Sequence, residues 1–188
     1  MQRSEKMFPE DIIITDTNKE DVFEMQEDYP CCCRDVIITE KSIRTVPWHW
    51  HEELEFLYVR EGEIDYWTAG NYVHLKKSDG LFINTNVMHQ VIFPADIEHI
   101  RSQVFMIRPE FLAEEGSLLD KKYVRSVLYD HKFQAAVFRQ ESAIQKKVLE
   151  NMQEMSRIYE KKAFGYEMTF RNKAADMWID FLHMLGVE

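Results

Sequence analysis

The sequence predicts a mainly β fold, an antiparallel sandwich or barrel, with a pair of helices at its C-terminal end. Short apolar segments separated by Gly, Asn, Asp and Pro run from about residue 10 to 108, and this punctuation is typical of strands in all-β domains. From Pro109 onward the apolar residues recur at steps of three and four, which indicates helices. A chain of 188 residues, 45% of them hydrophobic, can bury one core and a small helical unit.

The β-barrel core is expected over residues 31–110. Its strand candidates follow one another as RDVIITEK, LEFLYVREG, EIDYWTAG, YVHLKK, LFIN, HQVIFP and HIRSQVFMI. Residues 1–30 form a charged N-terminal arm with scattered apolar residues and a candidate early strand near residues 10–16. Two interpretations of this arm stay open: a mobile cover over the barrel, and an ordinary disordered terminus.

Residues 111–141 should hold one short amphipathic helix, SLLDKKYVRSVL, and a connecting segment in which QAAVF is a candidate last strand. A helical hairpin is expected over residues 142–188. Its first helix should begin at Ser142, because Ser142 and Gln145 have the spacing of a capping box. The apolar positions at helical spacing are Ile144, Val148, Met152, Met155 and Ile158 in the first helix, and Phe170, Ala174, Trp178, Phe181 and Leu185 in the second.

The hairpin carries more apolar residues than one face against a small barrel can hide. An exposed apolar stripe of that length is an association surface, so the sequence predicts a two-fold homodimer built largely through the hairpin. The residues expected at the buried centre of this dimer interface are Met152, Met155, Trp178 and Phe181.

The charge and the apolar runs argue against several classes of partner. The formal charge is −10, with 33 acidic and 23 basic residues and no basic stripe, so this chain is not expected to grip DNA by itself. No run approaches the roughly 18 apolar residues of a membrane span, and the N-terminus has no apolar core of the signal-peptide type. We therefore expect no membrane partner and a cytoplasmic location. The consecutive Cys31, Cys32 and Cys33 fit reduced, packed thiols better than a disulfide framework.

The most informative segment is HWHEELEFLYVREG, residues 49–62. At the end of a strand, the period of two puts His49 and His51 on one face. Glu55 has the same parity, but on a straight strand it would lie roughly 13 Å from His51. The chain should therefore bend between residues 52 and 54, so that these groups converge from successive strands. His89 supplies a third imidazole after a later strand.

Three imidazoles and one carboxylate form a mixed nitrogen and oxygen set that suits a divalent Zn, Ni, Fe or Mn ion. The candidate metal ligands are His49, His51, Glu55 and His89. The alternative is a metal-free pocket in which the same histidines only form hydrogen bonds around a ligand.

The two histidine segments resemble the two cupin motifs. HWHEELEFLYVREG is similar to the first, with two histidines, a glutamate and a closing glycine, and SDGLFINTNVMH is similar to the second, with Asp79 and His89. The departures from the usual motif residues are Ile43, Ser78, Asn84, Asn86 and Phe93. The residues of both segments are most similar to those of the N-terminal domain of AraC-type transcriptional regulators, and this resemblance covers roughly residues 30–186.

The resemblance implies a cupin-type barrel that binds a small-molecule effector, for example a sugar, and dimerises through its helices. It also implies control of DNA binding by a C-terminal helix-turn-helix region, which these 188 residues do not contain. The alternative is a standalone metal-dependent cupin enzyme of the dioxygenase, isomerase or decarboxylase type, acting on a small acid or sugar. The helical hairpin favours the regulator and not an enzyme, because a catalytic cupin has no evident need for it.

The effector pocket is expected on the inner faces of the strands that carry the motifs. Leu57 and Val59 share the parity of Glu55, and Val91 and Phe93 share that of His89. Three aromatic residues are candidates for stacking on a sugar or flat ligand, and one cation is a candidate partner for an anionic effector: Tyr66, Trp67, Tyr72 and Arg44. At least one of the adjacent aromatic residues must face outward, and ordinary sheet packing or a solvated strand charge is the alternative reading of all four.

Overall fold

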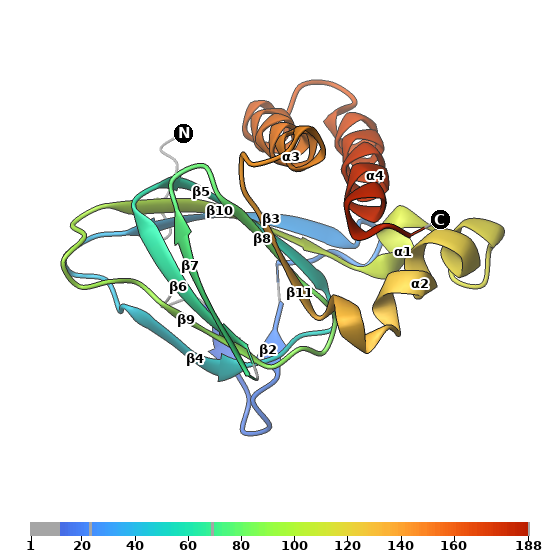
Figure 1. Cartoon of the computed structure of the whole chain (residues 1–188). Helices are drawn as coiled ribbons and strands as arrows, with labels where there is room; N and C mark the ends of the chain where they lie inside the picture. Colours follow the sequence, from blue (N-terminus) through green and yellow to red (C-terminus); the bar gives the residue numbers. More distant parts are fainter. Residues whose placement is uncertain (1–11, 23, 69, 188) are drawn as a thin grey trace.

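Two antiparallel sheets face one another, and a helical hairpin covers the outer face of one of them (Figure 1). The computed structural model describes residues 12–22, 24–68 and 70–187. The five-stranded sheet has the order β11-β8-β5-β10-β3, with bounds β3 (Cys31–Ile38), β5 (Leu54–Glu61), β8 (Gly80–Ile83), β10 (Ile100–Ile107) and β11 (Ala135–Phe138). The four-stranded sheet has the order β4-β9-β6-β7, with bounds β4 (Thr45–His49), β6 (Glu63–Thr68), β7 (Asn71–Lys76) and β9 (His89–Ile92).

The N-terminal segment adds a small hairpin of two strands, β1 (Ile13–Ile14) and β2 (Glu20–Asp21), beside β4. It is attached to the segment after β4 through the backbone, because the Trp50 N–H donates to the Asn18 carbonyl and the Glu20 N–H donates to the Trp50 carbonyl, at 2.9 and 2.8 Å. β1 coincides with the early strand expected near residues 10–16. The first 11 residues of the expected arm lie outside the described residues.

The predicted fold class, mainly β with C-terminal helices, is confirmed, and the two facing sheets form the jelly roll that the cupin resemblance implies. In the described part of the chain, the strand pairings form separate sheets and not one closed barrel. The β-domain also extends past its expected end at residue 110, because β11 leaves the connecting segment and pairs with β8.

The central strand β5 is buried on both faces, which explains its nearly continuous apolar run. Phe56 and Tyr58 point toward the helical hairpin, whereas Leu57 and Val59 point between the sheets. The same alternation divides the whole apolar core into two clusters, one under the helices and one between the sheets. The strands of this sheet, β5 among them, therefore connect the interior of the jelly roll with the hairpin.

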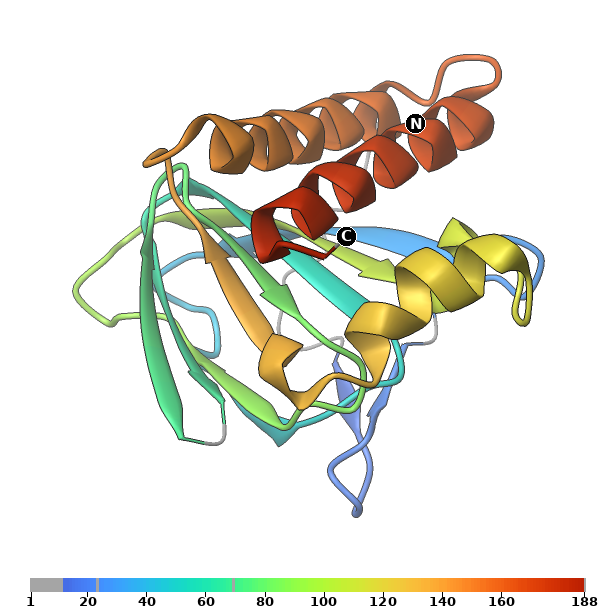
Figure 2. The same ribbon diagram turned by 45° about the vertical axis from the view of Figure 1, so that its right-hand side comes forward.

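The helical part begins with α1 (Pro109–Leu112), a π-helical turn over Asp120–Val124 that continues into α2 (Arg125–Leu128), and a short turn over His131–Phe133. The long helices are α3 (Ala143–Lys161) and α4 (Tyr166–Leu185), which lie antiparallel over the five-stranded sheet (Figure 2). Among the described residues, no helix has both the length and the apolar character needed to span a bilayer.

The start of α3 follows the expected cap only in part. The Ser142 hydroxyl accepts a hydrogen bond from the Gln145 N–H at 3.3 Å, as an N-cap should. The Gln145 side chain accepts from the Arg139 N–H instead of returning to Ser142. It therefore ties the helix to the end of β11 rather than completing the reciprocal capping box.

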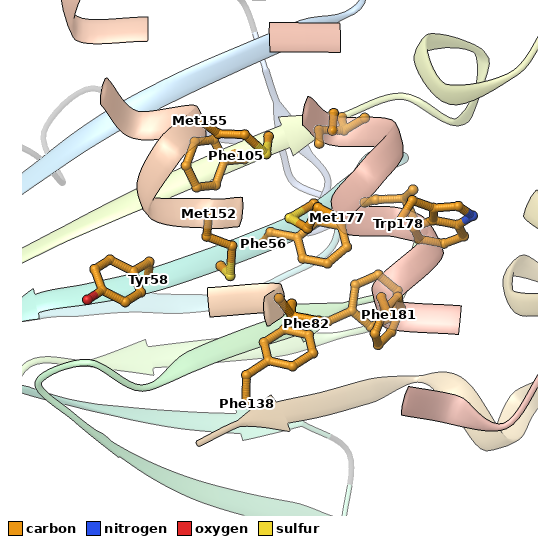
Figure 3. Packing of buried hydrophobic residues seen from close by; sticks show 14 of the residues in the cluster. Phe56, Tyr58, Phe82, Phe105, Phe138, Met152, Met155, Met177, Trp178 and Phe181 are labelled. Atoms are coloured by element: carbon orange, nitrogen blue, oxygen red, sulfur yellow. The ribbon is translucent and has the colours of Figure 1, made fainter. Parts of the chain in front are cut away.

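The four side chains expected at the centre of a dimer interface are instead buried within one chain. Their exposed fractions do not exceed 3%, and they pack on the outer face of the five-stranded sheet (Figure 3); they are Met152, Met155, Trp178 and Phe181. The interface prediction for these residues is wrong because the sheet offers a wider apolar surface than expected. Phenylalanines on three neighbouring strands, Phe56, Phe82 and Phe138, cover this surface and contact the hairpin.

Candidate ligand and metal site

Strand pairing and one bend bring the predicted histidines together between the sheets. His49, at the end of β4, is paired directly with His89, at the start of β9, and their ring centroids lie 4.1 Å apart. The chain turns after β4, so that His51 and Glu55, at the beginning of β5, approach each other with His51 Nε2 3.2 Å from Glu55 Oε2. All four side chains are buried. The expected bend between residues 52 and 54 thus lies where β4 gives way to β5.

Each of the three histidines has one ring nitrogen fixed by a backbone carbonyl. The Nδ1 atoms of His49, His51 and His89 lie 2.7, 3.0 and 2.9 Å from the carbonyl oxygens of Pro47, Glu53 and Val87 respectively. Since a carbonyl only accepts, each Nδ1 carries a proton and Nε2 is the nitrogen left for a metal ion or a ligand.

His51 and Glu55 form a buried ion pair. Both nitrogens of His51 face acceptors, the Glu53 carbonyl and the Glu55 carboxylate, so the ring is an imidazolium in this arrangement. Burial opposes this charge, but the hydrogen bond and the charge of Glu55 outweigh burial and raise the pKa of His51. Burial likewise opposes the Glu55 charge, yet His51 and His89 hold its pKa well below the ordinary value. Tyr66 also donates its hydroxyl to Glu55, at 2.7 Å.

His49 has the opposite tendency. Burial, together with the nearby His89 ring, lowers the pKa of His49 to about 4, although Glu20 acts in the opposite direction. His49 is therefore neutral near pH 7, with an unprotonated Nε2. Glu20, from the N-terminal hairpin, places its Oε2 atom 3.5 Å from this nitrogen.

The three imidazoles fit a divalent metal ion on two grounds. Their ligand nitrogens all lie within 4.8 Å of one another, close to the roughly 3–4 Å that separates donors bound about 2.0–2.1 Å from one ion. The buried Nε2 atom of His89 lies 3.6 Å from Glu55 Oε2, too far for a hydrogen bond, and has no hydrogen-bond partner among the described residues, and buried polar atoms rarely stay unpaired. Glu55 lies outside this group of three and is bonded to His51 and Tyr66 instead. A metal ion would have to displace the Nε2 proton of His51.

A small cavity of about 30 Å³ lies beside these groups, between the sheets. Of the residues expected in the effector pocket, those that line it are Leu57, Tyr66, Val91 and Phe93. Val59 is fully buried in the same apolar cluster but is not part of the cavity wall. The remaining wall comes from His49, Glu55, Ile12, Glu20, Arg34, Val36, Val46, Ser102 and Val104.

Three residues expected in the pocket lie elsewhere. Trp67 and Tyr72 pair with each other on the solvent side of β6 and β7, where they are 40% and 51% exposed. The alternation along β6 decides this, because Tyr66 takes the inward position and Trp67 must then face outward. Arg44 is half-buried outside the cavity and donates to the carbonyls of Pro94 and Ile97. It thus fastens the loop after β9 and does not reach a ligand in the cavity.

Sequence reasoning missed Glu20, Arg34 and Ser102. Glu20 was hidden in a charged segment that has no strong strand pattern, so only its strand pairing and its contact with Trp50 reveal that it enters the interior. Arg34 and Ser102 carried a usable signal. Both are polar residues at positions of β3 and β10 whose neighbours two residues away, Val36 and Val104, are inward-facing and apolar.

Comparisons with known proteins place this chain in a family. The sequence profile of the family described as AraC-like ligand binding domain matches residues 38–160. YdeC of Bacillus subtilis (strain 168), named an HTH-type transcriptional regulator, is 20% identical over 151 residues, which are 79% of this chain and 50% of that protein. The chain therefore spans about half the length of this curated relative.

Two solved structures are similar to this chain. An apo variant of ToxT from Vibrio cholerae has a TM-score of 0.57 at 8% identity, over 84% of this chain and 57% of that chain. A cupin-like protein from Thermotoga maritima has a TM-score of 0.39 at 23% identity, over 52% of this chain and 65% of that chain. At such identities the ToxT likeness bears on the fold alone.

Proposed function

The chain belongs to the family of AraC-like ligand-binding domains, and from this premise we propose that it senses a small molecule and thereby controls a DNA-binding region of an HTH-type regulator. The observation that carries the proposal is the polar constellation inside the jelly roll. His49, Glu55, Arg34 and Ser102 all line one interior cavity. A domain that only needed a core would fill this space with apolar side chains, because buried polar groups are costly.

The position of β5 suggests how the signal leaves the cavity. Glu55 and Leu57 face the cavity, whereas Phe56 between them contacts Trp178 and Phe181 of α4. A ligand that shifts β5 therefore changes the packing of the helical hairpin at the C-terminal end of this chain. For this to act as a switch, the ligand must bind one arrangement of the hairpin better than the other.

A divalent metal ion held by His49, His51 and His89 is part of the proposal. Zn, Ni, Fe or Mn suits three imidazoles with room for an oxygen ligand. When bound, the ion would act as a Lewis acid toward an oxygen of the small molecule. The Glu53 carbonyl would orient His51 by accepting a hydrogen bond from its Nδ1–H, and the Glu55 carboxylate, which faces His51 Nε2, would lie close enough to serve as an oxygen ligand once that nitrogen has lost its proton.

We also propose a homodimer that forms through an exposed face of α4. Met168, Ala175 and Ile179 are exposed and lie seven and four residues apart, which puts them on one face of α4. Light scattering at tens of micromolar should give a dimer that Met168→Glu with Ile179→Glu converts to a monomer. A wild-type monomer under these conditions would remove the dimer from the proposal.

A second candidate function rests on the three buried histidines. A metal-loaded site beside a cavity is also what a metal-dependent cupin enzyme would need. Metal-dependent turnover of a small acid or sugar, abolished by His89→Ala, would establish this alternative.

The sensing function can be tested by ligand binding and by transcription. Purified chain would be screened by thermal shift against small organic acids, sugars and amino acids. The matched variants are Val91→Phe, which fills the cavity, and Gln90→Phe, which adds the same ring to the neighbouring position of β9. A compound that stabilises the wild type and Gln90→Phe but not Val91→Phe binds in the cavity.

The same chain, fused to a DNA-binding region that requires an effector-controlled partner domain, should then make a reporter gene respond to that compound. The Val91→Phe fusion should not respond. Compounds that stabilise Val91→Phe equally, or a reporter that ignores a compound bound in the cavity, would refute the sensing function.

A further inference from the structure

Arg34 places a cation in the apolar interior of the jelly roll. Its exposed fraction is 7%, and in the β3–β10 pairing it lies opposite Val104. On the other side of Val104, Leu57 of β5 is paired with it, so Arg34, Val104 and Leu57 lie in one row across three strands. All three residues line the cavity wall. A buried charge of this kind is tolerated only when a partner of opposite charge satisfies it.

Two carboxylates of the N-terminal segment pair with the Arg34 guanidinium. Glu20 accepts from Nη1 at 2.5 Å, and Glu24 accepts from Nε and Nη2 at 3.1 and 2.8 Å. Glu20 is itself only 3% exposed and lines the same cavity. Its carboxylate thus lies between the Arg34 guanidinium and the Nε2 atom of His49, with one oxygen toward each.

The hairpin that carries Glu20 has few backbone bonds to the large sheets, while Ile14 packs against the apolar core between them and Lys19 pairs with Glu52 at 3.0 Å. Its strands β1 and β2 are two residues long, and two backbone hydrogen bonds link it to Trp50. The Trp50 indole N–H adds a third bond, to the Thr17 carbonyl at 3.1 Å. Segments with few backbone bonds to the rest of a domain open at a lower free-energy cost than the central strands.

Ser102 adds an unsatisfied polar atom to the same cavity. Its side chain is fully buried on the inner face of β10, and its Oγ atom has no hydrogen-bond partner in the described part of the chain. Ser102 lies opposite Val36, two residues along from Arg34, so the two side chains are diagonal neighbours on adjacent strands. A hydroxyl in that place can donate to an oxygen of the anion that Arg34 holds.

The size of the cavity shows that a ligand can enter only if a protein group leaves. At about 30 Å³ it has room for roughly one or two water molecules. Glu20 and Ile12 are wall groups from the N-terminal segment, and Glu20 is the one that occupies Arg34, whereas Leu57 and Val104 belong to the central sheet strands. Withdrawal of Glu20 would also leave Arg34 with a site for a new carboxylate.

From this geometry we propose that the effector is a small carboxylate with an apolar body. Until the effector binds, the Glu20 carboxylate occupies the position at Arg34 that the effector carboxylate would take. The ligand carboxylate replaces that of Glu20 between Arg34 and Ser102, and its apolar part lies against Leu57, Val91 and Phe93. Displacement of Glu20 releases the N-terminal hairpin from Trp50. This inference rests on the proposed sensing function and specifies its ligand class.

The test is a calorimetric titration of the 188-residue chain, stripped of metal by a chelator and then dialysed. The probes are straight-chain carboxylates from acetate to octanoate and benzoate, each with its primary amide of equal size. At least one carboxylate should bind ten or more times tighter than its amide. Hydrogen exchange at the Glu20 and Trp50 amides should then speed up at least tenfold on binding. The hydrogen bonds that these amides donate, to the Trp50 and Asn18 carbonyls respectively, are lost when the hairpin leaves Trp50.

Two variants separate the internal competitor from general charge effects. Glu20→Gln weakens the competing group and should tighten carboxylate binding at least fivefold, whereas Arg34→Gln should abolish it. Asp35→Asn is the matched control, since it removes the same charge from the neighbouring outward-facing residue, which pairs with Arg101 on the surface. It should leave the affinity within about twofold. Because Glu20→Gln keeps the size and most hydrogen bonds of the side chain, it remains informative if Arg34→Gln fails to fold.

The proposal is overturned if no carboxylate of the series binds, if amides bind as tightly, or if Glu20→Gln weakens binding. A neutral compound that binds in the cavity and drives the reporter fusion would leave the sensing function standing and remove the carboxylate class. Carboxylate binding that requires Arg34 without any reporter response would support the ligand class and count against the sensing function.

Discussion

Replacing Phe181 with alanine tests whether the hairpin belongs to the core of one chain. Phe181 is fully buried on α4, and its ring centroid lies 4.5 Å from that of Phe82 and 5.5 Å from that of Phe138. Phe56 lies 5.7 Å away, edge to face. Phe181 thus contacts three strands of the sheet at once, and no other chain is needed to bury it.

The expected loss of stability follows from burial and from the space left behind. Removing a fully buried phenylalanine ring forfeits roughly 2–3 kcal/mol of apolar transfer free energy. A residual cavity of about 50–100 Å³ adds roughly 1–2 kcal/mol at about 24 cal/mol per Å³. Phe181→Ala should therefore lower the free energy of unfolding by about 4 kcal/mol.

Urea unfolding followed by circular dichroism would measure this loss at 2 and at 50 micromolar protein. Asn172→Ala is the matched control, because Asn172 is a polar, exposed residue of the same helix and is not one of the apolar residues of the proposed dimer face; it should cost less than about 1 kcal/mol. The loss caused by Phe181→Ala should not depend on protein concentration. A loss below about 1 kcal/mol, or one that appears only where subunits dissociate, would return Phe181 to a dimer interface and refute the assignment to one chain.

Three further predictions concern protonation, backbone conformation and thiol chemistry. In metal-stripped protein, the lowered pKa of His49 means that the unfolded chain binds a proton at a higher pH than the folded chain does. As the pH drops from 6.5 to 4, the free energy of unfolding of the wild type should therefore fall by about 3 kcal/mol more than that of His49→Gln. Urea unfolding at each pH would contradict this if both proteins lost the same stability. Gly62→Ala should destabilise the fold by about 2–3 kcal/mol, because Gly62 has φ +80° and an added Cβ would lie 2.8 Å from the His99 carbonyl oxygen. Gly70→Ala, at φ +94° with no atom near the added Cβ, should cost less in the same thermal unfolding assay. Burial raises the pKa of Cys32 to about 12, so a thiol reagent at pH 8 should label it rapidly only in denaturant, and rapid labelling of the native protein would show that β3 opens.

The sequence predicted the site better than it predicted the surfaces. His49, His51 and His89 could be placed because strand parity and one bend fix where they point, and both features are written in local spacing. Trp67 was assigned to the pocket although its neighbour Tyr66 already held the inward position. Arg44 was assigned there by charge alone, and charge says nothing about which carbonyls a long side chain can reach.

The sequence by itself determined the fold class, the order of strands and helices, the central motif and the membership of a regulator family. These follow from apolar periodicity and residue spacing, which act over short stretches of chain. Only the tertiary structure decided that Met152 and Phe181 pack on the sheet of their own chain, because periodicity identifies an apolar face but not the surface that covers it. Only the tertiary structure brought Glu20 to Arg34, 14 residues further along the chain. In the sequence, the Glu20 carboxylate and the Arg34 guanidinium look like ordinary surface charges. They become part of a site only because the fold buries them together, where each neutralises the charge of the other.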